Sequence, residues 1–231
     1  MKYLLSLQQK KTRHLEKKFL VEGVKMVEEL IENHSELIEE VWATSSTQIQ
    51  SDSIEINPIS SKDLQRISAH KSPNGCFALV RFPEVLAKGQ FTLVLDEIQD
   101  PGNMGTIIRL ADWYGIDDIV CSNTTVDCFN PKVIQSCMGS LFRTAIRYTD
   151  LREYLAQDAR PKYATLLNGQ NLYQTELKPS AILVLGNEGN GVSAEVENLC
   201  EHAVNIPRIG KAESLNVSIA GAICLAAFFG K

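Results

Sequence analysis

The sequence predicts an α/β protein of two parts, a small domain at residues 1–85 and a larger parallel-sheet domain at residues 90–231. After residue 90, apolar segments of strand length alternate with helical or loop segments, which is typical of a parallel sheet covered by helices on both faces. Hydrophobic residues make up 44% of the chain and charged residues 22%, so it can bury a sizeable core. We expect residues 83–90 to form the linker between the two domains.

The first 18 residues are basic, although the whole chain carries a net charge of −5. Six lysines and arginines stand there against one glutamate, a surplus of five positive charges. Lys10, Lys11 and Arg13 are therefore candidates for phosphate contacts. The alternative is the solvated face of a helix. The whole-chain charge provides no general basic field for a nucleic-acid partner.

The rest of the first part has the pattern of a compact α/β unit. A short strand at residues 19–22 ends at Gly23, and Val24, Val27 and Ile31 then recur at helical spacing among glutamates. The further elements expected are strands at residues 41–44 and 54–56, a helix capped by Ser61 that runs to about residue 69, a turn at residues 72–75, and a strand at residues 76–82.

The second part contains six strand candidates. They are residues 91–95, 118–121, 145–148, 163–167, 181–185 and 203–206. In parallel sheets of this kind ligands bind at the carboxyl ends of strands. The loops that follow the strands are therefore the places to look for a site.

The first unusual loop follows residue 95. A Pro-Gly turn places Asn103 at the entry of a helix, and Arg109 then stands among apolar residues. A permanently charged guanidinium in such a setting needs a partner or a ligand. The structural alternative is an ion pair, with Asp96, Asp100 or Asp112 as the partner.

The second unusual loop, residues 185–193, is rich in glycine. Its glycines allow a ligand to approach the backbone closely, although a plain turn would have the same composition. It is not a phosphate-binding loop, because no Lys-Ser/Thr pair follows, and its glycine order reverses that of the dinucleotide fingerprint. The carboxylate of Glu188 favours a hydroxyl-, amine- or cation-bearing ligand over a phosphate.

The third loop and the helix after it form the end of the sequence. Pro207 and Gly210 predict a loop at residues 206–213, and Ser214 or Asn216 can cap the uncharged helix that follows. The helix start presents free N–H groups to electron-rich ligand atoms, or it is simply the capped end of a buried helix. Its apolar run is too short to span a membrane.

The cysteines and histidines indicate which disulfides and metal sites the sequence can form. None of the six cysteines forms a C-x-x-C pair and several lie in apolar runs, so we expect reduced core residues of a cytoplasmic protein. The four histidines have no metal-ligand spacing, and no metal is expected. We find no apolar signal segment and expect the protein in the cytoplasm.

Together the three loops resemble those of the SpoU-type (TrmH-like) RNA ribose 2′-O-methyltransferases of the SPOUT superfamily. The matching motifs are residues 100–105 with Arg109, residues 185–189 with Gly191, and residues 206–207 with Gly210 and residues 214–218. Residues 19–23 and 72–75 resemble a small RNA-binding domain, related to ribosomal proteins, that is fused to many members. Arg208 departs from the family pattern, in which a methionine is usual at this position. The difference leaves the backbone pattern intact and bears on the local contacts of the loop.

The resemblance implies a catalytic domain with a deep carboxy-terminal trefoil knot. It further implies S-adenosyl-L-methionine as the methyl donor, held in a bent shape by the knotted loops, with S-adenosyl-L-homocysteine as the product. The expected partners are structured RNA and a second copy of the chain, packed through the knot helices. The two-domain layout favours ribosomal RNA by analogy, and transfer RNA remains the alternative.

The family motifs also assign roles to individual residues. Arg109 would stabilise the ribose oxygen or a neighbouring phosphate, although the family also casts this arginine as a general base. The other implied positions fall into three groups: catalytic, Asn103, Glu188, Ser214 and Asn216; cofactor-binding, Leu167, Gly186, Asn187, Glu188, Gly189, Ile206, Pro207, Leu215 and Asn216; and RNA-binding, Lys10, Lys11, Arg13 and Glu22.

Two other classes of function are open to the same sequence. A non-catalytic RNA-binding module would explain the first domain, but it has no need of Asn103, Arg109, Glu188 and Asn216 together. A nucleotide-dependent oxidoreductase fits the α/β alternation but lacks the fingerprint loop.

Overall fold

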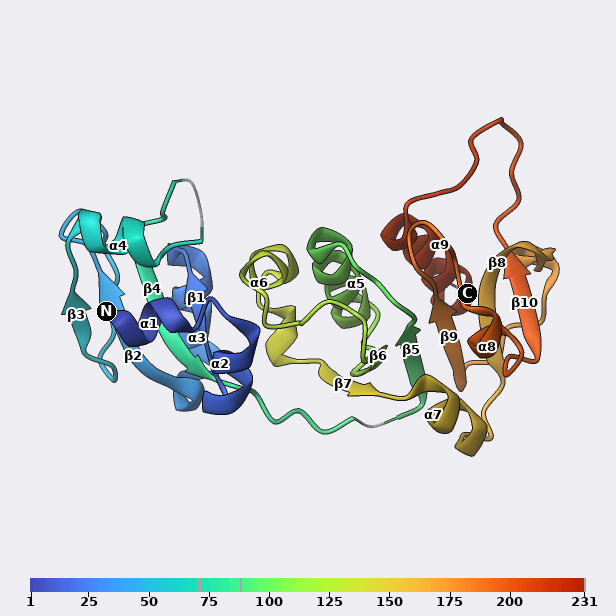
Figure 1. Ribbon diagram of the computed structural model, residues 1–231, viewed down its shortest axis with the longest axis horizontal. Helices are drawn as coiled ribbons and strands as arrows, with labels where there is room; N and C mark the ends of the chain where they lie inside the picture. Colours follow the sequence, from blue (N-terminus) through green and yellow to red (C-terminus); the bar gives the residue numbers. More distant parts are fainter. Residues whose placement is uncertain (70–71, 88, 231) are drawn as a thin grey trace. The chain divides into compact units, whose positions relative to one another are not determined.

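The computed structural model describes residues 1–69, 72–87 and 89–230, and its contacts divide the chain into two compact units (Figure 1). Unit 1 comprises Met1–Glu84 and Asp127–Phe142, and unit 2 comprises Val85–Val126 and Arg143–Lys231. The chain therefore passes between the units three times. The sequence predicts a single passage at residues 83–90, of which residue 88 lies outside the described residues. Segment 127–142 was not expected in the first unit.

Unit 1 is built on a four-stranded sheet of order β1-β4-β2-β3. β4 is antiparallel to both of its neighbours, and β3 is parallel to β2. The strands are β1 (Lys18–Glu22), β2 (Ile38–Ala43), β3 (Ile56–Pro58) and β4 (Cys76–Arg81). The helices are α1 (Lys2–Ser6), α2 (Lys10–Glu16), α3 (Val24–Asn33), α4 (Ser61–Ile67) and α6 (Pro131–Cys137), with short 3₁₀ turns η1 (Ser35–Leu37) and η2 (Ser140–Phe142).

The core of unit 1 forms because strand β4 is covered on both faces. Successive side chains of a strand point to opposite faces, so Phe77 and Leu79 pack with apolar residues of α1 and α4. Buried residues of the third helix, Val27 and Leu30, belong to the same unit. The sequence pattern for β1 and β4 is thereby confirmed.

Helix α4 differs from its expected limits at both ends. Ser60, not Ser61, is its cap, since the Ser60 side chain accepts a hydrogen bond from the Asp63 N–H at 3.1 Å. The helix ends at Ile67 because Ser68 is already extended, with φ −60° and ψ 139°. Both residues at the start are serines, so composition alone could not separate them.

Unit 2 is built on a six-stranded sheet of order β10-β8-β9-β5-β6-β7, and every neighbouring pair is parallel. The predicted parallel α/β domain is confirmed. Its strands are β5 (Phe91–Leu95), β6 (Asp118–Ser122), β7 (Ala145–Thr149), β8 (Lys162–Asn171), β9 (Ala181–Leu185) and β10 (His202–Asn205). Its helices are α5 (Pro101–Trp113), α7 (Leu151–Gln157), α8 (Ala194–Glu197) and α9 (Val217–Phe229), with the 3₁₀ turn η3 (Leu172–Gln174).

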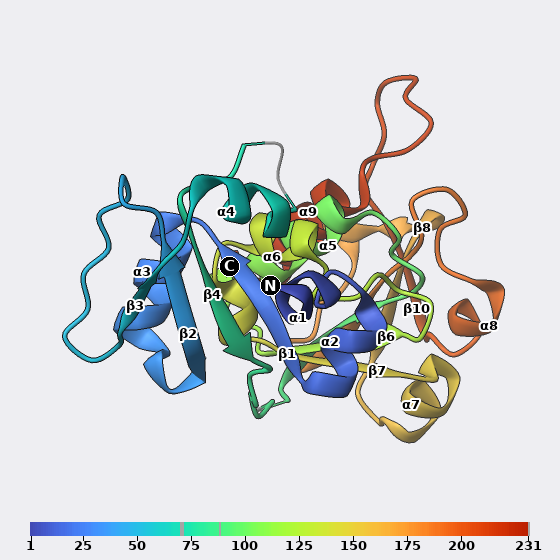
Figure 2. The same ribbon diagram turned by 60° about the vertical axis from the view of Figure 1, so that its left-hand side comes forward.

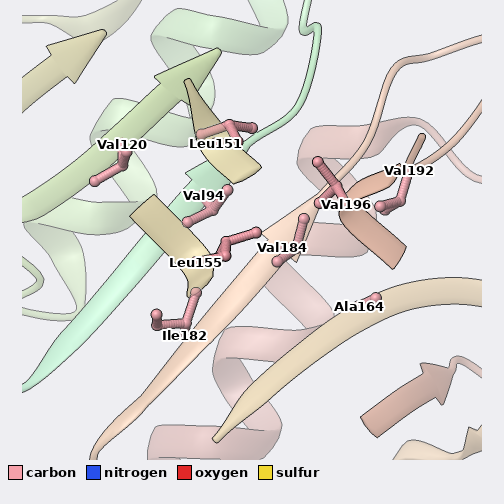
Figure 3. Packing of buried hydrophobic residues seen from close by; sticks show 9 residues of the cluster. All are labelled: Val94, Val120, Leu151, Leu155, Ala164, Ile182, Val184, Val192 and Val196. Atoms are coloured by element: carbon pink, nitrogen blue, oxygen red, sulfur yellow. The ribbon is translucent and has the colours of Figure 1, made fainter. Parts of the chain in front are cut away.

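Helices cover both faces of this sheet. On one face Val94 and Val184 pack with Leu155 of α7 and Val196 of α8 (Figure 3). On the other face α9 lies against the sheet closely enough that a Cβ on Gly221 would come within 3.0 Å of Leu185 Cδ1. The small residues predicted in α9 thus allow a close approach to the central strands.

None of the six cysteines forms a disulfide, and all but Cys200 are buried, in line with the expected reduced thiols. Burial raises the pKa of the Cys76, Cys200 and Cys224 thiols to about 12. These thiols stay protonated and unreactive near neutral pH. In the described ranges, none of the helices has the length and apolar content needed to cross a membrane.

Because segment 127–142 belongs to unit 1, removal of the amino-terminal part should expose its apolar residues. A chain that begins at Phe91 would leave Val133, Ile134 and Phe142 without the amino-terminal part of their unit, although all three are buried in the full chain. We expect the truncated chain to bind an apolar dye and to melt at a lower temperature than the full chain. Dye fluorescence and thermal melts measure this. A truncated chain with no added dye binding and an unchanged melting temperature would contradict it.

Candidate active site

The candidate site is assembled from loops at the carboxyl ends of strands in unit 2. Strands β5 and β9 are neighbours, so the loop after Leu95 and the loop after Leu185 begin side by side at one sheet edge. The start of α9 adds Asn216 to them. Parallel pairing and hydrogen bonds thus join the first segment to two others, in contacts that span 88 and 113 residues of sequence.

The carboxylate of Glu188 is the centre of the hydrogen-bond network. Its Oε1 atom accepts bonds from the Asn103 side chain at 3.0 Å and from the Asp100 backbone N–H at 3.1 Å. Its Oε2 atom accepts a weaker bond from the Gln99 N–H at 3.3 Å. Partial burial raises the pKa of Glu188, but these hydrogen bonds outweigh it and the pKa lies below its ordinary value. Glu188 is therefore a charged acceptor at neutral pH.

Asn103 connects this carboxylate to the last helix. Its Nδ2 group donates to Glu188, and its Oδ1 atom accepts a 2.9 Å hydrogen bond from Asn216 Nδ2. Asn216 in turn caps α9, because its Oδ1 atom accepts from the N–H groups of Ser218 at 2.9 Å and Ile219 at 3.3 Å. Of the two residues predicted to cap α9, Ser214 and Asn216, the structure shows Asn216 as the cap. One amide side chain thus links the first and second loops to the third.

Arg109 lies on the exposed side of α5, six residues after Asn103. The three aspartates considered as ion-pair partners are engaged elsewhere. Asp96 accepts from Ser193 N–H, Asp100 caps α5 through the Asn103 N–H, and Asp112 pairs with Arg143. Across the described residues Arg109 forms no ion pair, so the structural alternative is wrong. Its charge remains available to a ligand.

The loop after β9 is held in a fixed shape. Asn187 donates from Nδ2 to the Glu97 carbonyl at 2.8 Å, and its Oδ1 atom accepts from the N–H groups of Gly189 and Asn190. Gly186 sits so close to the returning chain that a Cβ would lie 2.1 Å from the Val192 nitrogen. Any other residue at position 186 would displace the loop. The backbone of this loop is thus held in one shape by its own packing and hydrogen bonds.

The remaining cofactor candidates lie on the surface of unit 2. The Leu167 side chain on β8 is 74% exposed, and Leu215 is 49% exposed. Residues 207–216 are exposed throughout and project from the unit in both views (Figures 1 and 2). Arg208, the residue that departs from the family pattern, donates to the Ala212 carbonyl at 3.0 Å and so holds this loop internally. The structure does not bring Ser214, Ile206 or Pro207 into the Asn103 network.

Two of the four RNA-binding candidates have structural roles in unit 1. Arg13 is 3% exposed and pairs with Asp127 at 2.6 Å, so the expectation that it contacts phosphates is corrected. Glu22 accepts a 2.7 Å bond from Ser68 Oγ. Lys10 and Lys11 of α2 are exposed, as a phosphate contact requires.

Sequence reasoning missed three residues that shape the site. Asp100 serves twice, as the cap of α5 and through its N–H to Glu188, and an aspartate before a proline is a recognisable helix start. Gln99 contributes a backbone group, which no side-chain pattern reveals. Asp127 has a partner far away in sequence. Among the described residues, no group of His, Cys, Asp and Glu could hold a metal ion.

Known proteins of similar sequence share both parts of the chain. Residues 90–226 match the SpoU rRNA Methylase family, and residues 1–78 match the MRM3-like substrate binding domain. The chain is 33% identical over 225 residues to the 23S rRNA (guanosine(2553)-2'-O)-methyltransferase RlmP of Bacillus subtilis. That alignment covers 94% of this chain and 90% of the relative.

Solved structures agree over nearly the full length. A putative RNA methyltransferase of the TrmH family from Porphyromonas gingivalis has a TM-score of 0.85 and 36% identity, covering 98% of this chain and 95% of that one. The AdoMet-bound rRNA methyltransferase from Sinorhizobium meliloti has a TM-score of 0.81 and 26% identity, covering 98% and 92%. These matches confirm the resemblance found in the three loops. The chain belongs to the SpoU rRNA Methylase family.

Proposed function

We propose that this protein transfers the methyl group of S-adenosyl-L-methionine to a ribose 2′-hydroxyl of ribosomal RNA. The proposal rests on the network of Glu188, Asn103 and Asn216, together with Arg109 on the same helix as Asn103, which forms no ion pair among the described residues. The relative from Bacillus subtilis is named as a 23S rRNA 2′-O-methyltransferase, which supports the choice of RNA. A methylation assay with 23S rRNA and labelled cofactor tests it, and ribose analysis identifies the methylated position.

The residues of unit 2 fit the cofactor. When bound, S-adenosyl-L-methionine supplies an electrophilic methyl group. The close backbone approach at Gly186 leaves main-chain groups for an adenosyl ring, and Leu167 and Leu215 offer apolar surface. We further propose that residues 206–216 carry the chain through the trefoil knot that the family implies. The long exposed connection between β10 and α9 is compatible with that path.

The proposed mechanism follows from charge and position. The ribose oxygen forms its bond to the methyl carbon as the sulfur–methyl bond breaks, and the hydroxyl proton leaves to solvent. A guanidinium is a cation with fixed donor groups, so Arg109 stabilises the negative charge that develops on the oxygen, or the neighbouring phosphate. Glu188, charged and held by Asn103, fixes the loop and the start of α9 on either side of the reacting atoms.

Arg109 gives the sharpest test of this mechanism. Arg109→Ala should lower the single-turnover rate by two or more orders of magnitude, a loss of about 3 kcal/mol of transition-state stabilisation. Cofactor affinity and the melting temperature should stay nearly unchanged, because the side chain is exposed and makes no ion pair among the described residues. Arg109→Lys should restore little, since an ammonium lacks the planar fork. Calorimetry, thermal melts and rapid-quench methylation measure these quantities.

The matched control is Arg152→Ala. Arg152 is also a surface arginine of unit 2, and it pairs with Asp150 at 2.7 Å. Its replacement should leave the rate unchanged. If Arg109→Ala were folded and fully active, Arg109 would have no part in the chemistry.

The amino-terminal unit is proposed to bind the RNA, with Lys10 and Lys11 as phosphate contacts. The match to a substrate-binding domain and the exposure of both lysines support this. The double variant Lys10→Glu, Lys11→Glu should weaken RNA binding and lower the slope of log affinity against log salt by about two. Filter binding at several salt concentrations measures the slope. Lys25→Glu on the glutamate-rich helix α3 is the control, and an unchanged slope in the double variant would exclude the two lysines.

We propose a homodimer formed through α5 and α9. These two helices pack together, and they carry exposed apolar side chains that a partner would cover: Trp113 is 84% exposed, Ile219 52% and Phe229 38%. Light scattering should therefore report twice the chain mass of 25.6 kDa. Trp113→Glu with Ile219→Glu should give the single mass without loss of helix content. A wild-type monomer at micromolar concentration would contradict the assembly.

A further inference from the structure

The ion pair between Arg13 and Asp127 is buried in unit 1, and both side chains are 4% exposed. Arg13 comes from α2, whereas Asp127 begins the segment that enters unit 1 from the strand β6 region. Arg13 also donates from Nη1 to the carbonyls of Leu7 at 2.9 Å and Gln8 at 2.8 Å. The pair therefore fixes the chain turn between α1 and α2 to the first residue of segment 127–142.

The aspartate has further partners that hold it in place. Its Oδ1 atom lies 3.0 Å from His14 Nε2 and accepts a 3.3 Å bond from the Phe129 N–H. The Phe129 ring stacks on Phe82 at 3.6 Å between centroids. Burying two charges costs free energy, and Arg13 Nε has no hydrogen-bond partner among the residues that the structure describes, so stability alone does not explain this arrangement. What the pair supplies is a defined position for residue 127.

The residues just before Asp127 belong to unit 2 and hold the first site loop. The Val126 N–H donates to the Ile98 carbonyl at 2.9 Å, and Gln99 Nε2 donates to the Thr124 carbonyl at 2.8 Å. The backbone N–H of the same Gln99 is one of the donors to Glu188. A continuous path of covalent and hydrogen bonds therefore runs from Arg13 through Asp127 to the Glu188 carboxylate.

We propose that Arg13 and Asp127 are positioning residues for methyl transfer. By anchoring residue 127 in the amino-terminal unit, the pair sets residues 122–126 and, through them, the backbone groups that hold Glu188. Neither residue touches the reacting atoms. The inference rests on the proposed RNA methyltransferase function.

The test compares the pair with its apolar replacement. Removing one charge alone leaves the other buried and unpaired, so single variants lose stability whatever the role of the pair. The double variant Arg13→Met, Asp127→Leu removes both charges and should melt near the wild type. With RNA and cofactor saturating, its single-turnover rate should still fall at least tenfold, while the cofactor Kd changes less than twofold. A rate equal to that of the wild type in the folded double variant would show that the pair is only structural.

A second variant tests the same path from the unit 2 side and does not depend on the fold of unit 1. Gln99→Met removes the side-chain bond to the Thr124 carbonyl and keeps the backbone N–H. It should also slow single turnover at least tenfold. In the combined variant the losses should not multiply, because both changes release the same segment. A wild-type rate for Gln99→Met, or multiplied losses, would overturn the proposal.

The control is the Lys18–Glu39 ion pair of unit 1. Among the described residues, neither side chain forms a hydrogen bond or ion pair with residues 122–127. Lys18→Gln with Glu39→Gln should leave the rate unchanged. The wild-type enzyme is assayed on the same RNA. If it transfers no methyl group, the proposed function fails. If it is active and the variants match it, only the positioning role fails.

Discussion

The Asn103 side chain makes the interaction on which the site depends. Its donor end holds Glu188 and its acceptor end takes the Asn216 amide, so both halves of one carboxamide are used. Each partner has a second duty: Glu188 receives two backbone N–H groups of the first loop, and Asn216 caps α9. An aspartate at position 103 would oppose Glu188 with a like charge, and a leucine would leave the partners unsatisfied. The amide of Asn103 has both the donor and the acceptor that these partners need.

The two charged groups of the site, Glu188 and Arg109, have different surroundings. Glu188 is held ionised by its donors, and its pKa lies below the ordinary value. It is therefore an anchor with a fixed charge, and the loop positions do not change when protons move near neutral pH. Arg109 keeps its charge without an ion-pair partner among the described residues. A cation that no carboxylate neutralises can stabilise a developing oxyanion more strongly than a paired one, because its field is not cancelled beforehand.

The sequence predicts what depends on local chemistry and burial. The six parallel strands, a polar cap at the start of α9 and the reduced cysteines follow from apolar runs, a short polar side chain before a helix, and cysteine spacing. The spacing of apolar residues indicates that one face of a helix is buried, but it does not indicate which element that face packs against. The apolar side of α6 is buried as the pattern of Val133 and Ile134 requires, yet its partners lie in unit 1. For the same reason the basic count at the amino terminus could not show that Arg13 turns inward to Asp127.

The burial of Arg13 changes how the amino-terminal unit can attract RNA. Arg13 is buried and Lys18 is paired with Glu39, whereas Lys10 and Lys11 of α2 are exposed to solvent. Helix α3 of the same unit exposes Glu28 and Glu32, which repel a polyanion. A small domain with a weakly basic face and an acidic face gains orientation more than affinity from its charges. The charges of this unit therefore favour one orientation of a bound polyanion over the others.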